Sequence, residues 1–124
     1  HLLIRNFAPE RWPAGVPSGA LRKIPYSDCD NGPTKSWILA HREEPEWRPY
    51  YERAFAPRPE FELYDLAADP EQWQDVAGDP EYAEVLESLK EELAAELQRR
   101  EDPRLLGGAA ELFETELYFG GLGR

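Results

Sequence analysis

The sequence predicts a small α+β protein in which a short antiparallel sheet packs against a long helix near the C-terminus. Two stretches, residues 2–7 and 61–66, combine apolar and β-branched side chains in the alternation that is typical of strands. A third stretch, residues 82–97, repeats apolar side chains every three or four positions, as an amphipathic helix does. With 124 residues, the chain has room for one modest core.

The segment between the two strands is expected to hold a long loop and two short helices. Residues 8–32 are rich in proline and glycine, which break both helix and strand. A loop of this length is uncommon in a compact domain, so we expect it to lie against a larger domain. Residues 33–41 begin with a proline suited to a first helical turn, and residues 46–56 form the second helix. The second helix carries an aromatic stripe, which we expect to be core rather than a ligand cage: Trp47, Tyr50, Tyr51 and Phe55.

Two aspartate–proline pairs follow the second strand. Asp69 and Pro70 are expected to open a short helix that stops at Gly78, and Asp79 caps the long helix in the same way. Pro103 ends that long helix. The last residues, 105–124, form a C-terminal tail with turn glycines and an apolar stretch, which we expect to be docked.

The composition argues against several classes of partner. The net charge is -11 and the isoelectric point is near 4.6, so nucleic acid and anionic membrane surfaces are not expected to bind. No apolar run approaches the roughly 20 residues of a membrane span, so we expect no membrane contact. The one cysteine, Cys29, allows no disulfide within the chain and is expected to be a passive thiol.

Residues 62–65, Glu-Leu-Tyr-Asp, lead into two Asp-Pro pairs and a terminal helix. This order resembles the C-terminal subdomain of type I sulfatases, which belong to the alkaline phosphatase superfamily. Within that family the resemblance is greatest to the sulfamidase-like branch. The resemblance covers residues 1–104. It implies a C-terminal subdomain with a four-stranded antiparallel sheet, of which the residue pattern locates two strands, docked on a larger α/β sulfatase domain.

The sulfatase signature Cys-x-Pro-Ser-Arg or Ser-x-Pro-Ser-Arg does not occur in this sequence, and Cys29 precedes Asp30-Asn31-Gly32 instead. The resemblance therefore implies that formylglycine and Ca²⁺ belong to a catalytic domain outside this chain, which is the expected partner. No catalytic residue and no metal site are assigned here, and the isolated chain is expected to be inactive. The implied reaction of the parent is hydrolysis of a sulfate ester or sulfamate on a sugar. Phosphonate and phosphodiester hydrolases share similar architecture, so the leaving group stays open.

Two residues are candidate substrate-binding groups at the entrance of that catalytic domain. Lys35 lies in the first turn of the helix at residues 33–41, where free amides and the helix dipole favour an anion. His41 lies at the end of the same helix. The alternatives are a solvated surface lysine and a structural histidine. Asp28 and Asp30 also give a faint resemblance to a calcium loop, against which a plain turn is favoured.

A competing interpretation is a free-standing acidic interaction module without catalysis. Its exposed aromatic side chains, around Trp12, Trp37 and Trp47, would bind a partner protein. The chain opens directly on a strand pattern and contains no methionine, so we expect further sequence upstream. The resemblance implies a periplasmic, extracellular or lysosome-like location for the parent, while the sequence itself assigns none.

Overall fold

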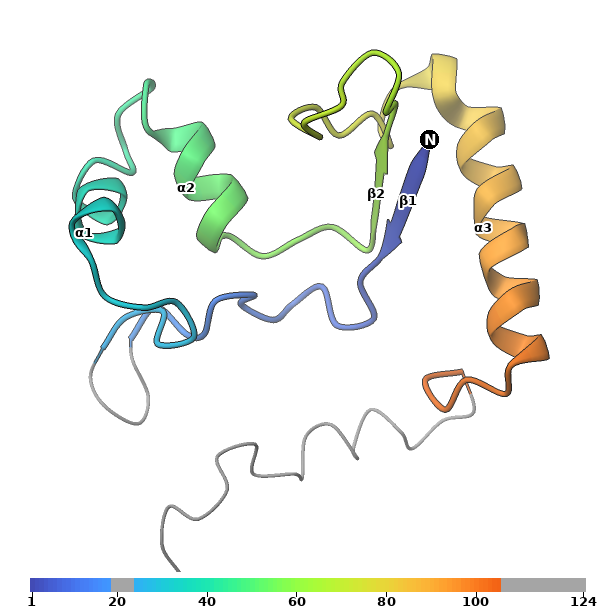
Figure 1. Ribbon diagram of the computed structural model, residues 1–124, viewed down its shortest axis with the longest axis horizontal. Helices are drawn as coiled ribbons and strands as arrows, with labels where there is room; N and C mark the ends of the chain where they lie inside the picture. The colour runs from blue at the N-terminus through green and yellow to red at the C-terminus, as the bar shows by residue number, and fades with distance from the viewer. Residues whose placement is uncertain (19–23, 106–124) are drawn as a thin grey trace, which may run out of the picture. The chain divides into compact units, whose positions relative to one another are not determined.

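A computed structural model of the chain describes residues 1–18 and 24–105. The α+β fold class predicted from the sequence is confirmed. Strands β1 (Leu2–Arg5) and β2 (Phe61–Tyr64) form a two-stranded sheet, and they run side by side in opposite directions (Figure 1). The Asn6 amide donates to the Glu60 carbonyl at 2.8 Å, which extends the pairing just beyond the strands. The described residues thus contain two of the four strands that the resemblance implies.

The chain divides into two compact units, and the sheet contributes to both. One unit is Ile4–Glu62, and the other combines His1–Leu3 with the chain from Leu63 onward. Within residues 1–18 and 24–105, no helix has both the length and the apolar character that a bilayer crossing requires.

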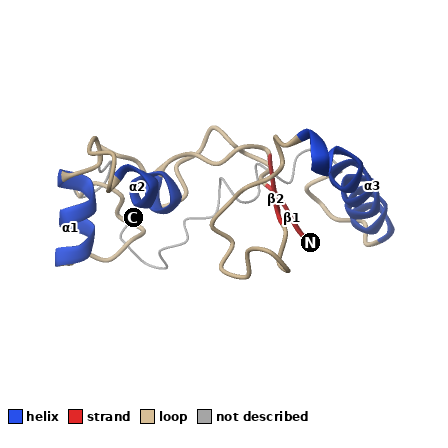
Figure 2. Ribbon diagram, turned by 90° about the horizontal axis from the view of Figure 1, so that it is seen from above, coloured by secondary structure: helices blue, strands red, loops and turns tan. Residues whose placement is uncertain are grey.

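The unit Ile4–Glu62 contains two helices that pack against each other, α1 (Pro33–Ala40) and α2 (Arg48–Phe55) (Figures 1 and 2). Both were predicted, and each is shorter than expected. Helix α1 begins after Gly32, has a proline in its first turn and ends where the His41 amide donates to the Trp37 carbonyl at 3.1 Å. Tyr26 and Phe55, 5% and 3% exposed, form the apolar core of this unit.

The predicted long loop, residues 8–32, contains no helix or strand in its described parts. Its two halves are tied together by backbone bonds from Tyr26 to the Val16 carbonyl and from Asp28 to the Ala14 carbonyl, both 3.1 Å. Gly15 has a φ of +86°, and a side chain there would approach the Ser27 amide to 3.1 Å. The loop is therefore held by its own contacts, and its expected contact with a larger domain stays a prediction.

In the other unit, the predicted helix after Asp69 is wrong. The chain makes one turn, with the Gln72 amide donating to the Asp69 carbonyl at 3.1 Å, and then Gln72 enters the left-handed region at a φ of 57°. Beyond it, Val76 donates to the Leu63 carbonyl at 2.8 Å, so this segment runs beside β2 instead of coiling. The proline in the first turn was a correct turn signal, but tertiary pairing with β2 replaced the helix.

The second aspartate–proline pair behaves as predicted. The Asp79 carboxylate accepts a 3.0 Å bond from the Glu81 amide and opens a single 3₁₀ turn, η1 (Pro80–Tyr82). This turn continues into the long helix α3 (Ala83–Arg99), which ends before Pro103 because Glu101 adopts a φ of 51°. Among the residues of this unit that the structure describes, the buried apolar ones are Leu63, Tyr64, Val76 and Leu97. The tail predicted at residues 105–124 lies, after Leu105, outside the described residues.

Candidate functional site

Lys35 is buried, with 7% of its surface exposed, and its side chain is directed into the loop that precedes α1. Its ammonium donates to the carbonyls of Tyr26 and Cys29, both at 2.8 Å, and to Oδ1 of Asn31 at 3.2 Å. An ammonium has three hydrogens, and each has an acceptor here. Lys35 therefore fastens residues 26–31 to the first turn of α1.

This arrangement corrects the alternative that Lys35 is a solvated surface lysine. Contact with a substrate stays a prediction for Lys35, and in this conformation its ammonium already has protein acceptors. The loop with faint calcium character directs two of its oxygen atoms, the Cys29 carbonyl and Asn31 Oδ1, at the ammonium. In the part of the chain that the structure describes, no group of three metal-ligating side chains comes together.

His41 caps the end of α1 and stacks on Trp37. The two rings lie 3.8 Å apart between centroids and 24° from parallel, and His41 Nδ1 is 2.8 Å from the Trp37 carbonyl oxygen. This geometry gives His41 a role in the ring cluster at the end of α1. A substrate contact by His41 stays a prediction.

A group of rings lies at the junction of α1 and α2, and we call it the aromatic surface: Trp37, His41, Trp47 and Tyr50. Trp37 is 49% exposed and Tyr50 is 44% exposed. Trp47 lies between them, with its ring centroid 5.8 Å from that of Trp37 and 5.6 Å from that of Tyr50. Large rings that touch each other and still face solvent form a candidate interaction surface.

The aromatic stripe predicted on the second helix divides between core and surface. Tyr51 and Phe55 turn inward, where the Tyr51 hydroxyl is 2.8 Å from that of Tyr26. Burial, followed by the hydrogen bond with Tyr51, raises the pKa of Tyr26 to about 12. Trp12 lies edge-on to Tyr26 at 6.0 Å, so it joins this inner cluster and not the aromatic surface.

The aspartates that follow β2 close turns. Asp65 Oδ1 accepts from the Ala67 amide at 3.0 Å, and this bond is the main reason why the pKa of Asp65 lies below its usual 3.8. Asp69 accepts from the Gln74 amide at 2.7 Å. Asp75 accepts from the Leu63 amide at 2.9 Å, which satisfies a donor at the edge of β2. Asp65 and Asp69 thus close turns, and only Asp79 caps a helical turn as expected. Asp75 was not identified from the sequence.

Glu62 is, with Lys35, one of two buried charged residues among those that the structure describes. The sequence pattern did not predict the burial of Glu62. It is 5% exposed although it lies in a short strand. Asn6 donates to its Oε1 at 2.9 Å, and the Arg58 guanidinium lies 3.7 Å from its Oε2. The Glu62 carboxylate thus links Asn6, just after β1, to Arg58 in the segment before β2.

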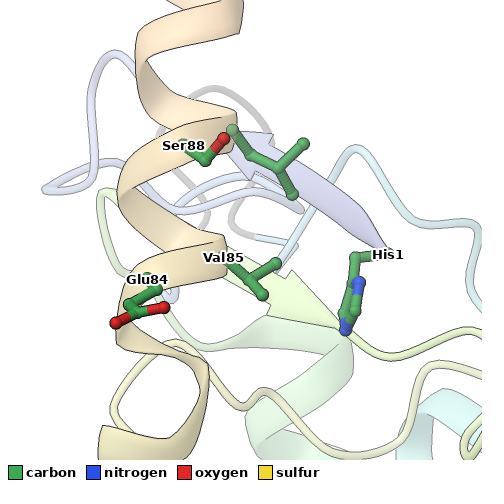
Figure 3. Close-up of a pocket in the computed structure, with 5 residues that line it drawn as sticks. His1, Glu84, Val85 and Ser88 are labelled. Carbon is green, nitrogen blue, oxygen red and sulfur yellow. The ribbon is translucent and has the colours of Figure 1, made fainter.

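An open hollow of about 310 Å³ lies between the first residue and α3 (Figure 3). Val85 and Leu89 form its apolar part, with Ser88 and His1 beside them. Figure 3 shows Glu84 pointing away from His1. The hollow suits an apolar side chain better than a charged ligand, because its wall is mostly hydrocarbon.

Comparison with known proteins shows that part of this chain is similar to part of a sulphohydrolase, which supports a sulfatase-like relationship. The similar protein is human N-sulphoglucosamine sulphohydrolase, which is 41% identical over 56 residues. The match spans 45% of this chain and 10% of the length of that protein. No family model matches the chain, and no solved structure does.

Proposed function

We propose that this chain is the C-terminal subdomain of a sulfatase-like hydrolase, with a structural role and a part in shaping the substrate entrance. The observation that carries the proposal is the 41% identity over 56 residues to N-sulphoglucosamine sulphohydrolase. The arrangement of β2, its aspartate-capped turns and α3 supports it, because this is the order of elements in which the resemblance was found.

The parent would hydrolyse a sulfate ester or a sulfamate on a sugar. Such a reaction needs a nucleophile, a cation that offsets charge on the sulfuryl oxygens and an acid for the leaving group. In the proposal, formylglycine and Ca²⁺ supply the first two from a catalytic domain outside this sequence. This chain contributes packing and shape, and alone it is inactive.

The entrance role belongs in this proposal to residues 26–31 and to the residue that holds them, Lys35. A loop that is fastened at three acceptors keeps its shape when a substrate passes. His41 contributes at the other end of α1. If Lys35→Ala in the parent left both KM and kcat for the sulfated substrate unchanged, the entrance role would be refuted.

A second function is favoured by one specific observation, the exposure of Trp37 and Tyr50. An acidic module that binds a partner protein through the aromatic surface, without any catalysis, would account for it. The two proposals differ in one respect: the sulfatase proposal requires that the same reading frame also encode a catalytic domain with the formylglycine signature, and the module proposal does not.

The test is an assay of the longest protein that the reading frame encodes, using a generic aryl sulfate and a glucosamine N-sulfate. We expect turnover that disappears when the Cys or Ser of the formylglycine signature is replaced by Ala. The 124-residue chain assayed alone should be inactive. A long product that carries formylglycine and turns over neither substrate would contradict the proposal.

A further inference from the structure

The aromatic surface is exposed although its own unit has a formed core. Tyr26 and Phe55 are 5% and 3% exposed, whereas Trp37 on the neighbouring helix is 49% exposed. Burying a large ring stabilises a fold by roughly 2–3 kcal/mol, so rings grouped in solvent leave this stabilisation unused. A second body that covered them would recover it.

The charges around the aromatic surface favour a neutral protein partner. The unit Ile4–Glu62 contains nine basic and nine acidic residues, so the acidic excess of the chain lies in the other unit. The arginines that flank the rings have local partners: Arg48 binds Glu52 at 3.0 Å, and Arg42 lies 3.4 Å from Glu43. A sulfated glycan needs a surplus of positive charge, which these pairs do not provide.

The angles between the rings also favour a protein partner over a glycan. Trp37 and Trp47 are 80° from parallel, and Trp47 and Tyr50 are 40° from parallel. A flat sugar ring stacks best on a level platform, and these rings form a ridged one. Ridges of Trp and Tyr suit the pockets of a protein surface, where such side chains carry much of the binding energy.

We propose that the aromatic surface is the face on which the catalytic α/β domain of the parent packs, with Trp37, its most exposed tryptophan, as the anchor. This inference rests on the proposed function. The matched region is 10% of the length of N-sulphoglucosamine sulphohydrolase, so a protein of that kind has a much larger body available to cover the surface. A ring-rich face on the charge-balanced unit Ile4–Glu62 is covered at a lower electrostatic cost than a face of the strongly acidic unit would be.

The test is hydroxyl-radical footprinting of the parent protein, read by mass spectrometry. Trp37 and Trp73 are matched probes, because they are 49% and 46% exposed and lie in different units. If the catalytic domain covers the aromatic surface, Trp37 is oxidised at least about fivefold more slowly than Trp73 in the parent. Equal oxidation rates for the two residues, whether high or low, would overturn the inference.

Two further arms distinguish domain docking from glycan binding and from a failure of the proposed function. Protection of Trp37 that appears only after a heparin-derived disaccharide is added would overturn docking and assign the surface to glycan binding. Aryl sulfate turnover is measured on the same sample. An active parent with a freely oxidised Trp37 contradicts the docking inference alone, whereas absence of a parent or of its activity contradicts the proposed function.

Discussion

Lys35 has three acceptors because a buried ammonium must replace the water that it loses on folding. The sequence placed this residue in the first turn of a helix, where an anion site is a reasonable expectation. The direction of its side chain was not predictable, because two of its acceptors are backbone carbonyls of a loop without regular structure. Sequence patterns identify side-chain types, and they do not identify the carbonyls that a loop turns inward.

Replacing Lys35 with Met keeps the apolar stem and removes the ammonium, so the Tyr26 and Cys29 carbonyls lose a charged donor. We expect a loss of about 2–4 kcal/mol in the free energy of unfolding, measured by urea denaturation. Lys90→Met is the matched control, because Lys90 pairs with Glu87 on the surface of α3 at 2.7 Å. It should cost about 0.5 kcal/mol or less. Equal losses for the two variants would refute the fastening role of Lys35.

The raised pKa of Tyr26 predicts that the free energy of unfolding falls in strong alkali. Its pKa rises from 10.0 to about 12 in the folded protein, so folding favours the protonated phenol. The contribution is complete below pH 10 and is lost as the pH rises toward 12, by an amount on the order of 2 kcal/mol. Denaturant titrations at pH 9 and pH 12 measure it. Lysines titrate in the same range, so Tyr26→Phe is the control and should show a clearly smaller decrease.

At the scale of elements, the predictions succeeded where local signals agreed with tertiary pairing. The strands at 2–7 and 61–66 and the helix from 82 were all found, with ends trimmed by a few residues. The helix expected after Asp69 failed because Asp75 and Val76 bond to Leu63 across the unit. Such a non-local pairing leaves no periodic trace in the sequence.

The left-handed conformation of Glu101, just after the end of α3, can be tested by substitution. Glu101 donates its amide to the Gln98 carbonyl, and Asp102 donates to the Leu97 carbonyl, which closes the helix with Glu101 at a φ of 51°. Glycine adopts this conformation without steric cost. Glu101→Gly should therefore stabilise the protein by about 1 kcal/mol in urea denaturation. Glu101→Ala removes the same charge and keeps the strain, so a gain as large as that of glycine would contradict the assignment.

At the scale of the whole molecule, the sequence predicted the fold class and a sulfatase-like relationship, while the candidate surface needed the structure. The stripe Trp47, Tyr50, Tyr51 and Phe55 has one helical spacing, and the spacing alone does not show that Tyr50 faces solvent while Phe55 is buried. That division follows from the packing of α1 and Tyr26 against α2. The acidity of the second half is visible in the sequence alone, and the unit boundaries add that the unit Ile4–Glu62 is balanced in charge.

The measurement that tests the central claim most directly is the reading frame upstream of His1. A sulfatase-like parent predicts a continuous frame of several hundred residues that contains Cys-x-Pro-Ser-Arg or Ser-x-Pro-Ser-Arg, with formylglycine at its first position in the mature protein. A frame that begins at or just before His1 would contradict the claim, and the aromatic surface would then be the binding face of a free-standing acidic module.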